Sequence, residues 1–243
     1  MTFIEAPLHF GLLLTTTIIL LLMTLIGFLW VVKTENARAG LWSGFLTIFF
    51  AFFTFLILTI MVFQVPAVAT VSELLPYSLG AWTCVSLHAF FLLYYVLGFR
   101  WLQKRVWLAI LPVIGTMGFV TILWIYATPA NMILVFDGVM NWLAMPSIIV
   151  GVGGVLAIFY MFLAPTFAVY QVTKSQEGMV KMGNWISWIG LFLWFIAALL
   201  MALVLYVAPY MLFVIALATV AYILVFIGWL MATRGISSPA STG

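Results

Sequence analysis

The sequence predicts an all-α integral membrane bundle of seven transmembrane helices, with the N-terminus outside and the C-terminus in the cytoplasm. Three observations predict this fold. Hydrophobic residues make up 67% of the chain and charged residues only 5%, whereas a soluble domain carries roughly 25% charged residues. Seven apolar segments have the length that a helix needs to cross a bilayer. The basic residues fall in alternate connectors between these segments.

The apolar segments divide the chain into one transmembrane domain, residues 1–234, and a polar tail, 235–243, which we expect to be disordered. Each span is expected to be helical, because a helix satisfies its own backbone hydrogen bonds in lipid. The first span lacks the basic flank and cleavage site of a signal peptide, so we expect it to be retained. We place the spans near residues 8–32, 41–64, 81–100, 106–127, 147–170, 185–207 and 210–232.

The connectors predict the orientation, because Lys and Arg concentrate on the cytoplasmic side of membrane proteins. The N-terminus and the connectors 65–80 and 128–146 contain only acidic charges, so they are expected outside. The 128–146 connector is too apolar for a free loop, and we expect either a short interfacial helix or a cap over the outer mouth of the bundle. All the basic residues lie in the other connectors or after the last span: Lys33, Arg38, Arg100, Lys104, Arg105, Lys174, Lys181 and Arg234.

Small residues repeat along one face of two predicted spans, which predicts close packing against neighbouring helices. In the second span these residues are Gly40, Gly44, Thr47, Ala51 and Thr54. In the fifth span they are Ser147, Gly151 and Gly154.

Two prolines lie inside predicted spans, Pro112 in the fourth and Pro165 in the fifth. Proline removes a backbone donor and clashes with the preceding turn, so each is expected to kink its helix. Such a kink either acts as a hinge or is static.

The interiors of the spans contain no Asp, Glu, Lys or Arg at mid-depth. Proton pumps, ion-coupled transporters and voltage sensors normally keep such groups within the membrane, so these classes are disfavoured. The last span has no lysine for a retinal Schiff base, which argues against a microbial rhodopsin. The basic residues form no dense patch with interleaved aromatics, so nucleic-acid binding is not expected.

The third span carries the strongest candidate for an interior functional side chain, His88. Cys84, His88 and Tyr95 share one helix face there. This face either contacts a ligand or binds haem or a metal, or His88 is a neutral histidine bonded to a neighbouring helix. A haem would need His9 as its second ligand, and we estimate a depth difference of about 10 Å between the two. We therefore expect no cofactor, with haem as the alternative, and no metal, since Cys84 and His88 alone make a poor zinc site.

No set of nucleophile, base and orienting group is recognisable, and no phosphate-binding glycine loop occurs. The sequence therefore gives no argument for enzymatic activity. The two basic loops, 100–105 and 171–184, either bind anionic lipid or a cytoplasmic partner, or only set the topology. The residues concerned are Arg100, Lys104, Arg105, Lys174 and Lys181.

Three stretches carry a family resemblance: SLHAFFLLYYVLGF with its basic loop, VWLAILPVIG, and YQVTKSQEGMVKMGNWISWIGLFL. Together they resemble the seven-helix membrane-sensing region of some prokaryotic histidine kinases and related stand-alone archaeal proteins. The resemblance covers about half the chain and implies a sensor in a prokaryotic cell membrane. No dimerisation helix or kinase domain follows Arg234, so any output is expected to pass through a separate partner.

Four hypotheses for the function follow. The first is a non-catalytic seven-helix sensor or receptor-like module that responds to an apolar ligand. The second is an accessory subunit of a larger membrane complex, such as a respiratory assembly. The third is a b-haem or quinone-site protein using His88. The fourth is an uncharged-solute transporter, although no inverted repeat is visible.

Overall fold

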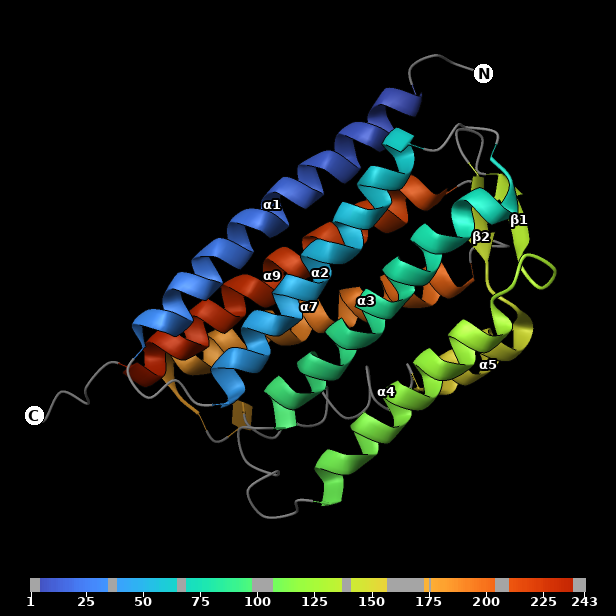
Figure 1. Cartoon of the computed structure of the whole chain (residues 1–243). Helices are drawn as coiled ribbons and strands as arrows, with labels where there is room; N and C mark the ends of the chain where they lie inside the picture. Colours follow the sequence, from blue (N-terminus) through green and yellow to red (C-terminus); the bar gives the residue numbers. More distant parts are fainter. Residues whose placement is uncertain are drawn as a thin grey trace, which may run out of the picture.

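The structure, a computed structural model, describes residues 5–34, 39–64, 69–97, 107–136, 141–156, 173–174, 176–203 and 210–237. Long α-helices make up most of this part of the chain, and two short strands lie between the fourth and fifth helices (Figure 1). The elements are α1 (Glu5–Lys33), α2 (Ala39–Gln64), α3 (Val71–Leu97), α4 (Trp107–Tyr126), β1 (Ile133–Phe136), β2 (Asn141–Ala144), α5 (Ser147–Leu156), α7 (Gly178–Ala202) and α9 (Met211–Ser237).

Five of these helices, α1, α2, α3, α7 and α9, are long and apolar enough to cross a membrane. The chain is therefore a multi-pass α-helical membrane protein. The predicted fourth span coincides with α4. The predicted fifth span begins with α5, but residues 157–172 lie outside the described part, so the count of seven crossings stays a prediction.

The helices run alternately between two ends of the bundle (Figure 1). We call one the hairpin end, because β1 and β2 lie there beside the start of α3. We call the other the basic end, because α1 ends there at Lys33 and the last turn of α9, also there, contains Arg234. Since α1 begins at the hairpin end and α9 finishes at the basic end, the chain makes an odd number of net passes through the bundle.

The start of α3 corrects the prediction that the third span begins at residue 81. The helix begins ten residues earlier, at Val71. Thr70 and Glu73 form a capping box: the Thr70 N–H donates to Glu73 Oε2 at 2.7 Å, and the Glu73 N–H donates to Thr70 Oγ1 at 3.4 Å. These bonds satisfy backbone donors of the first turn that have no partner within the helix. Pro76 is accommodated inside the helix.

The 128–146 connector contains an antiparallel hairpin, so the expectation of an interfacial helix was wrong. Leu134 pairs with Leu143 and Val135 with Trp142. Pairing lets the backbone N–H and C=O groups of the two strands bond to each other. The branched and aromatic side chains of these residues are also common in strands. Residues 142–144 are buried against the bundle, and the hairpin lies at one end of it (Figure 1). The alternative expectation, a cap over the outer mouth, stays a prediction.

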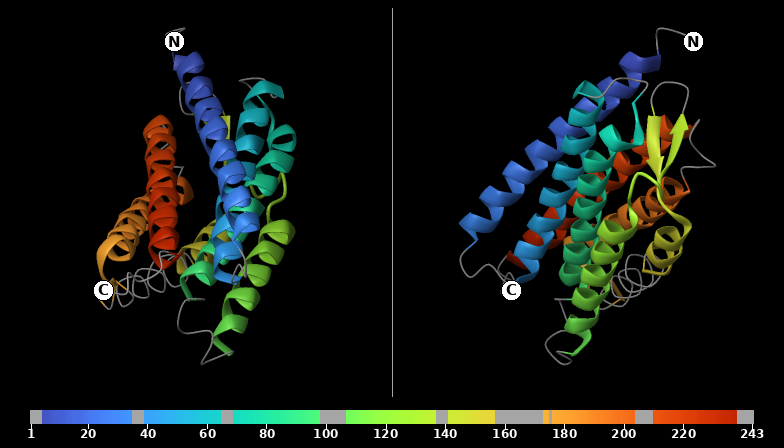
Figure 2. Two further views of the ribbon diagram at one scale, coloured as in Figure 1. Left: turned by 90° about the vertical axis from the view of Figure 1, so that its left-hand side faces the viewer. Right: turned by 45° about the vertical axis from the view of Figure 1, so that its right-hand side comes forward.

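The five long apolar helices pack as two assemblies, while α4 contacts α3 and α5 contacts both α4 and α7. One, which we call the α1–α3 group, consists of α1, α2 and α3, with α2 packed between the other two. The other is the α7–α9 pair, whose two helices contact each other more extensively than any other described elements do. Figure 2 shows the pair standing beside the group, and α1 also contacts α9. The candidate functional site lies where the two assemblies meet.

Candidate functional site

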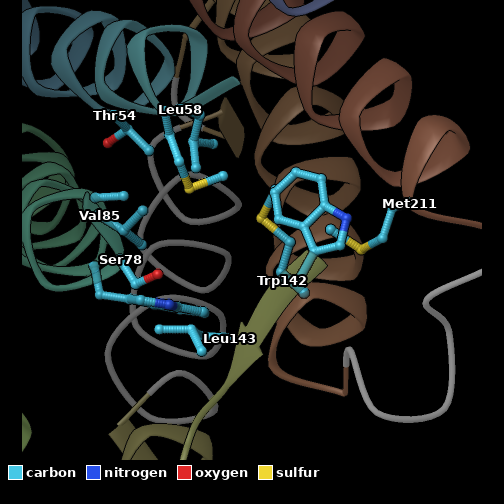
Figure 3. A pocket seen from close by; sticks show the side chains of 11 residues that line it. Thr54, Leu58, Ser78, Val85, Trp142, Leu143 and Met211 are labelled. Atoms are coloured by element: carbon cyan, nitrogen blue, oxygen red, sulfur yellow. The ribbon is translucent and has the colours of Figure 1, made fainter. Parts of the chain in front are cut away.

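A pocket lies at the hairpin end between the α1–α3 group and the α7–α9 pair (Figure 3). The space inside it that a ligand could occupy is about 60 Å³, less than half of the roughly 150 Å³ of a cavity that holds one benzene ring. Its lining comes from α2, α3, β2, α7 and α9: Thr54, Leu58, Met61, Ser78, Ala81, Trp82, Val85, Trp142, Leu143, Met201 and Met211.

The described residues of the lining are mostly apolar, and none of them carries a charged side chain. Two hydroxyls provide its side-chain oxygens. The Thr54 hydroxyl donates to the Phe50 carbonyl of its own helix at 2.9 Å. The Ser78 hydroxyl instead is directed away from α3 into the space facing Trp142 (Figure 3). The lining also includes the indole N–H groups of Trp82 and Trp142, which are hydrogen-bond donors.

His88 lies on the same face of α3 as the lining residues Ala81 and Val85, one turn further from the hairpin end. It is only 2% exposed. Its Nδ1 lies 2.8 Å from the Thr47 carbonyl on α2, and because a carbonyl only accepts, Nδ1 carries the proton. The Nε2 atom of the neutral ring is then an acceptor, and no atom of the described residues donates to it.

The imidazole of His88 also connects the group with the pair, through Trp194 of α7 and Tyr222 of α9. Its ring centroid lies 4.8 Å from that of Trp194 and 5.2 Å from that of Tyr222. Trp194 Nε1 donates to the Tyr222 hydroxyl at 2.8 Å. We call Thr47, His88, Trp194 and Tyr222 the histidine cluster. This arrangement agrees with the structural interpretation of His88, a histidine bonded to a neighbouring helix.

The pocket and the histidine cluster share one interface. Met201 follows Trp194 by seven residues on α7, and Thr54 follows Thr47 by seven on α2, spacings that keep side chains on one helix face. The pocket wall and the histidine cluster therefore use the same faces of α2 and α7.

The residue predicted as the second haem ligand, His9, lies on α1, whereas His88 lies on α3. His9 is buried within the first two turns of α1. Because α3 begins at Val71, His88 lies about 25 Å along its helix from the hairpin end. The depth difference between His9 and His88 is therefore larger than the value of about 10 Å estimated from the sequence. Two axial haem ligands must face one iron atom, and this offset disfavours the pair. The described residues contain no cluster of three or more His, Cys, Asp or Glu.

Cys84 is half-buried on α3. Tyr95 lies in the last turn of α3, but its side chain is outside the described part. The role of these two residues in a ligand face stays a prediction.

The small-residue stripe of α2 is buried: Thr47 is 1% exposed and Ala51 0%. A Cβ at Gly44 would lie 2.6 Å from Nε1 of Trp229, so α9 packs closely at this position. On α5, Ser147 and Gly151 are exposed, and no described atom lies within 4 Å of a Cβ at Gly151. The surroundings of Gly40 and Gly154 are outside the described part, so the packing role of the second stripe stays a prediction.

The closest described helix contact lies within the α7–α9 pair and was not predicted. A Cβ at Gly190 would lie 2.7 Å from the Val225 N atom, and one at Gly183 would lie 2.7 Å from the Gly228 carbonyl oxygen. The signal was present in the sequence: Gly183 and Gly190 are seven residues apart, as are Ala221 and Gly228. Such spacings place small residues on one helix face.

The predicted hinges and basic contacts are only partly described. Pro112 is the sixth residue of α4, and Pro165 lies outside the described residues. Lys174 and Lys181 are exposed. Arg100, Lys104 and Arg105 are outside the described part, so the roles of these residues stay predictions.

No protein-family model matches the chain, and comparisons with curated proteins and with solved structures find no match either. The fold and its pocket define a multi-pass α-helical membrane protein with an apolar cavity between two helix assemblies.

Proposed function

We propose that the protein is a non-catalytic seven-helix membrane sensor, or receptor-like module, that passes its response to a separate partner. The observation that carries the proposal is the position of the pocket. It lies between two helix assemblies rather than inside one, with walls from both. A small molecule bound in it would favour one particular distance between the α7–α9 pair and the α1–α3 group.

The histidine cluster provides the mechanical connection in this proposal. His88 is bonded to α2 and packs on rings of α7 and α9. Helix shifts of about 1–2 Å are typical of switching at packed interfaces. A shift of that size would repack the His88 ring and move the ends of α7 and α9 at the basic end.

The proposed orientation places the hairpin end outside and the basic end in the cytoplasm of a prokaryotic cell, with seven crossings. Support comes from Lys33, Lys181 and Arg234, which lie at the basic end of α1, α7 and α9. Basic residues concentrate on the cytoplasmic side. The separate partner would then meet the basic end, and the resemblance to kinase-linked sensing regions agrees with this.

Limited proteolysis tests whether the pocket communicates with the basic end. Ala81, which is buried and lines the pocket, is replaced by Phe to fill it. We expect Ala81→Phe to change the rate of tryptic cleavage after Lys181, in the first turn of α7, because local opening there depends on how the pair is seated. Mass spectrometry of the fragments measures the rate.

The matched control is Val113→Phe, which adds the same ring at an exposed position on α4. Circular dichroism checks that both variants keep their helix content. Equal cleavage rates in wild type and both variants would show that the pocket is not coupled to the basic end. A chain that purifies only in a complex of fixed stoichiometry would favour the accessory-subunit hypothesis instead.

A further inference from the structure

His88 places a strong hydrogen-bond acceptor in the interior of the bundle. The Thr47 carbonyl accepts the bond from Nδ1 at 2.8 Å, so the proton of the neutral ring is on Nδ1 and Nε2 presents a lone pair. Nε2 is buried, and no atom of the described residues donates to it. A histidine within a membrane-spanning helix is rare and often marks a functional site. Nε2 therefore requires a donor.

Tyr222 carries the complementary group. Among the described residues its oxygen has one hydrogen-bond partner, the indole of Trp194, which donates to it at 2.8 Å. A phenol that accepts one bond still has its own proton to donate. The Tyr222 side chain is only 4% exposed, and buried polar groups are nearly always bonded. The hydroxyl proton of Tyr222 therefore requires an acceptor, just as Nε2 of His88 requires a donor.

The acceptor and the donor lie in rings that contact each other. The imidazole of His88 meets the phenol ring of Tyr222 edge-on, with the ring centroids 5.2 Å apart. Within an imidazole, the lone pair of Nε2 is directed away from the N–H of Nδ1. Nε2 therefore faces away from Thr47 and α2, and the described rings that contact His88 on the side of the α7–α9 pair are those of Trp194 and Tyr222. The Tyr222 hydroxyl does not itself donate to Nε2.

We infer that one water molecule bridges the Tyr222 hydroxyl and Nε2 of His88. A water both accepts and donates, and through two bonds of about 2.8 Å it joins polar atoms up to about 6 Å apart. Buried waters in proteins are held in this way, by polar groups that lack another partner. The described side chains of the histidine cluster carry no charge, so an ion would lack a counter-charge here.

The bridge provides a contact between α3 and α9 that tolerates movement. A direct hydrogen bond weakens steeply when its geometry is distorted, whereas a water is attached to neither helix and can follow both. The α1–α3 group and the α7–α9 pair therefore stay connected at His88 through helix shifts of about 1–2 Å. This water site does not depend on a ligand in the pocket.

Nitrogen NMR of the histidine side chains tests the bridge, because the chain contains only His9 and His88. The full-length protein is prepared in lipid bilayers with histidine labelled with the NMR-active nitrogen isotope, and His9→Gln assigns the two sets of signals. Transfer of magnetisation from water protons to each ring nitrogen is measured by solid-state NMR. For His88 we expect a protonated Nδ1, an unprotonated Nε2 that receives magnetisation from water, and an Nε2 resonance shifted from that of a free acceptor.

Tyr222→Phe keeps the ring beside His88 and removes only the hydroxyl. We expect it to abolish or strongly reduce the transfer from water to Nε2 and to shift the Nε2 resonance toward that of a free acceptor. The matched control is Thr219→Val, which removes another buried hydroxyl of α9, one that lies 2.8 Å from the Thr16 hydroxyl on α1. It should leave both signals of His88 unchanged.

Three results would overturn the bridge. The first is a wild-type Nε2 that is protonated or receives no magnetisation from water. The second is a transfer that Tyr222→Phe leaves unchanged, since the water would then not join the two residues. The third is an equal loss in Thr219→Val, which would indicate a general loosening of α9. If Tyr222→Phe does not fold, the wild-type spectrum alone decides whether water donates to Nε2.

Discussion

The two helix interfaces of this protein are built from different residues. Within the α7–α9 pair, glycines bring backbone against backbone, and a Cβ at Gly190 would lie 2.7 Å from the Val225 N atom. Between the pair and the α1–α3 group, large rings fill the space, as at His88 and Trp194, and a cavity remains. Backbone contact leaves no room for alternative packing, whereas rings beside a cavity can repack. We therefore expect the pair to behave as a rigid unit and its junction with the group to be adjustable.

The largest expected effect is that of a methyl group added inside the pair. Gly190→Ala places a Cβ against backbone atoms of α9, so the helices must separate, and we expect a loss of roughly 1–3 kcal/mol of stability. Thermal unfolding in detergent, followed by tryptophan fluorescence, measures it.

Gly11→Ala on α1 is the matched control, since no atom of the described residues lies within 4 Å of a Cβ there. Helix propensity alone predicts unchanged stability or a gain of up to about 1 kcal/mol. Equal unfolding temperatures of the two variants would contradict the description of the pair as tightly packed.

A smaller effect is expected at the junction, from Gly44→Ala. The new Cβ would meet a side chain, the indole of Trp229, at 2.6 Å from its Nε1. A side chain can shift where a backbone cannot, so we expect a loss of roughly 1 kcal/mol, at the low end of the cost of overpacking. The same unfolding measurement applies.

The double variant Gly44→Ala with Trp229→Phe tests the cause of this loss. Phenylalanine is smaller than the indole, so the double variant should be more stable than the sum of the two single effects predicts. Strict additivity would show that Gly44 and Trp229 do not limit each other, and would contradict the steric explanation of the loss.

Much of the fold was predictable because lipid imposes a simple rule on each span. Helices α1, α2, α4 and α9 begin and end within a few residues of the predicted spans, since apolar length alone decides them. The starts of α3 and α7 were placed too late, because polar and charged residues such as Glu73 and Lys181 were assigned to connectors. The Thr70–Glu73 capping box was a readable signal for the true start of α3.

The site was less predictable than the fold. Periodicity predicted that His88 lies on a helix face with its neighbours and that the α2 stripe faces other helices, because both depend on one helix alone. The pocket combines α2, α3, β2, α7 and α9, and no periodicity within one helix specifies which residues of other helices meet it. The hairpin was missed because a short apolar connector reads equally as strand or helix.

The most direct test of the two-assembly description is a pair of spin-label distances at the basic end, in a chain with Cys84→Ala. One pair, Val32→Cys with Met182→Cys, spans the junction between α1 and α7, and the other, Val32→Cys with Trp42→Cys, lies within the α1–α3 group. All three positions are exposed. Filling the pocket with Ala81→Phe should change the first distance by about 1–2 Å and leave the second unchanged. Two unchanged distances, or equal changes in both, would contradict the account.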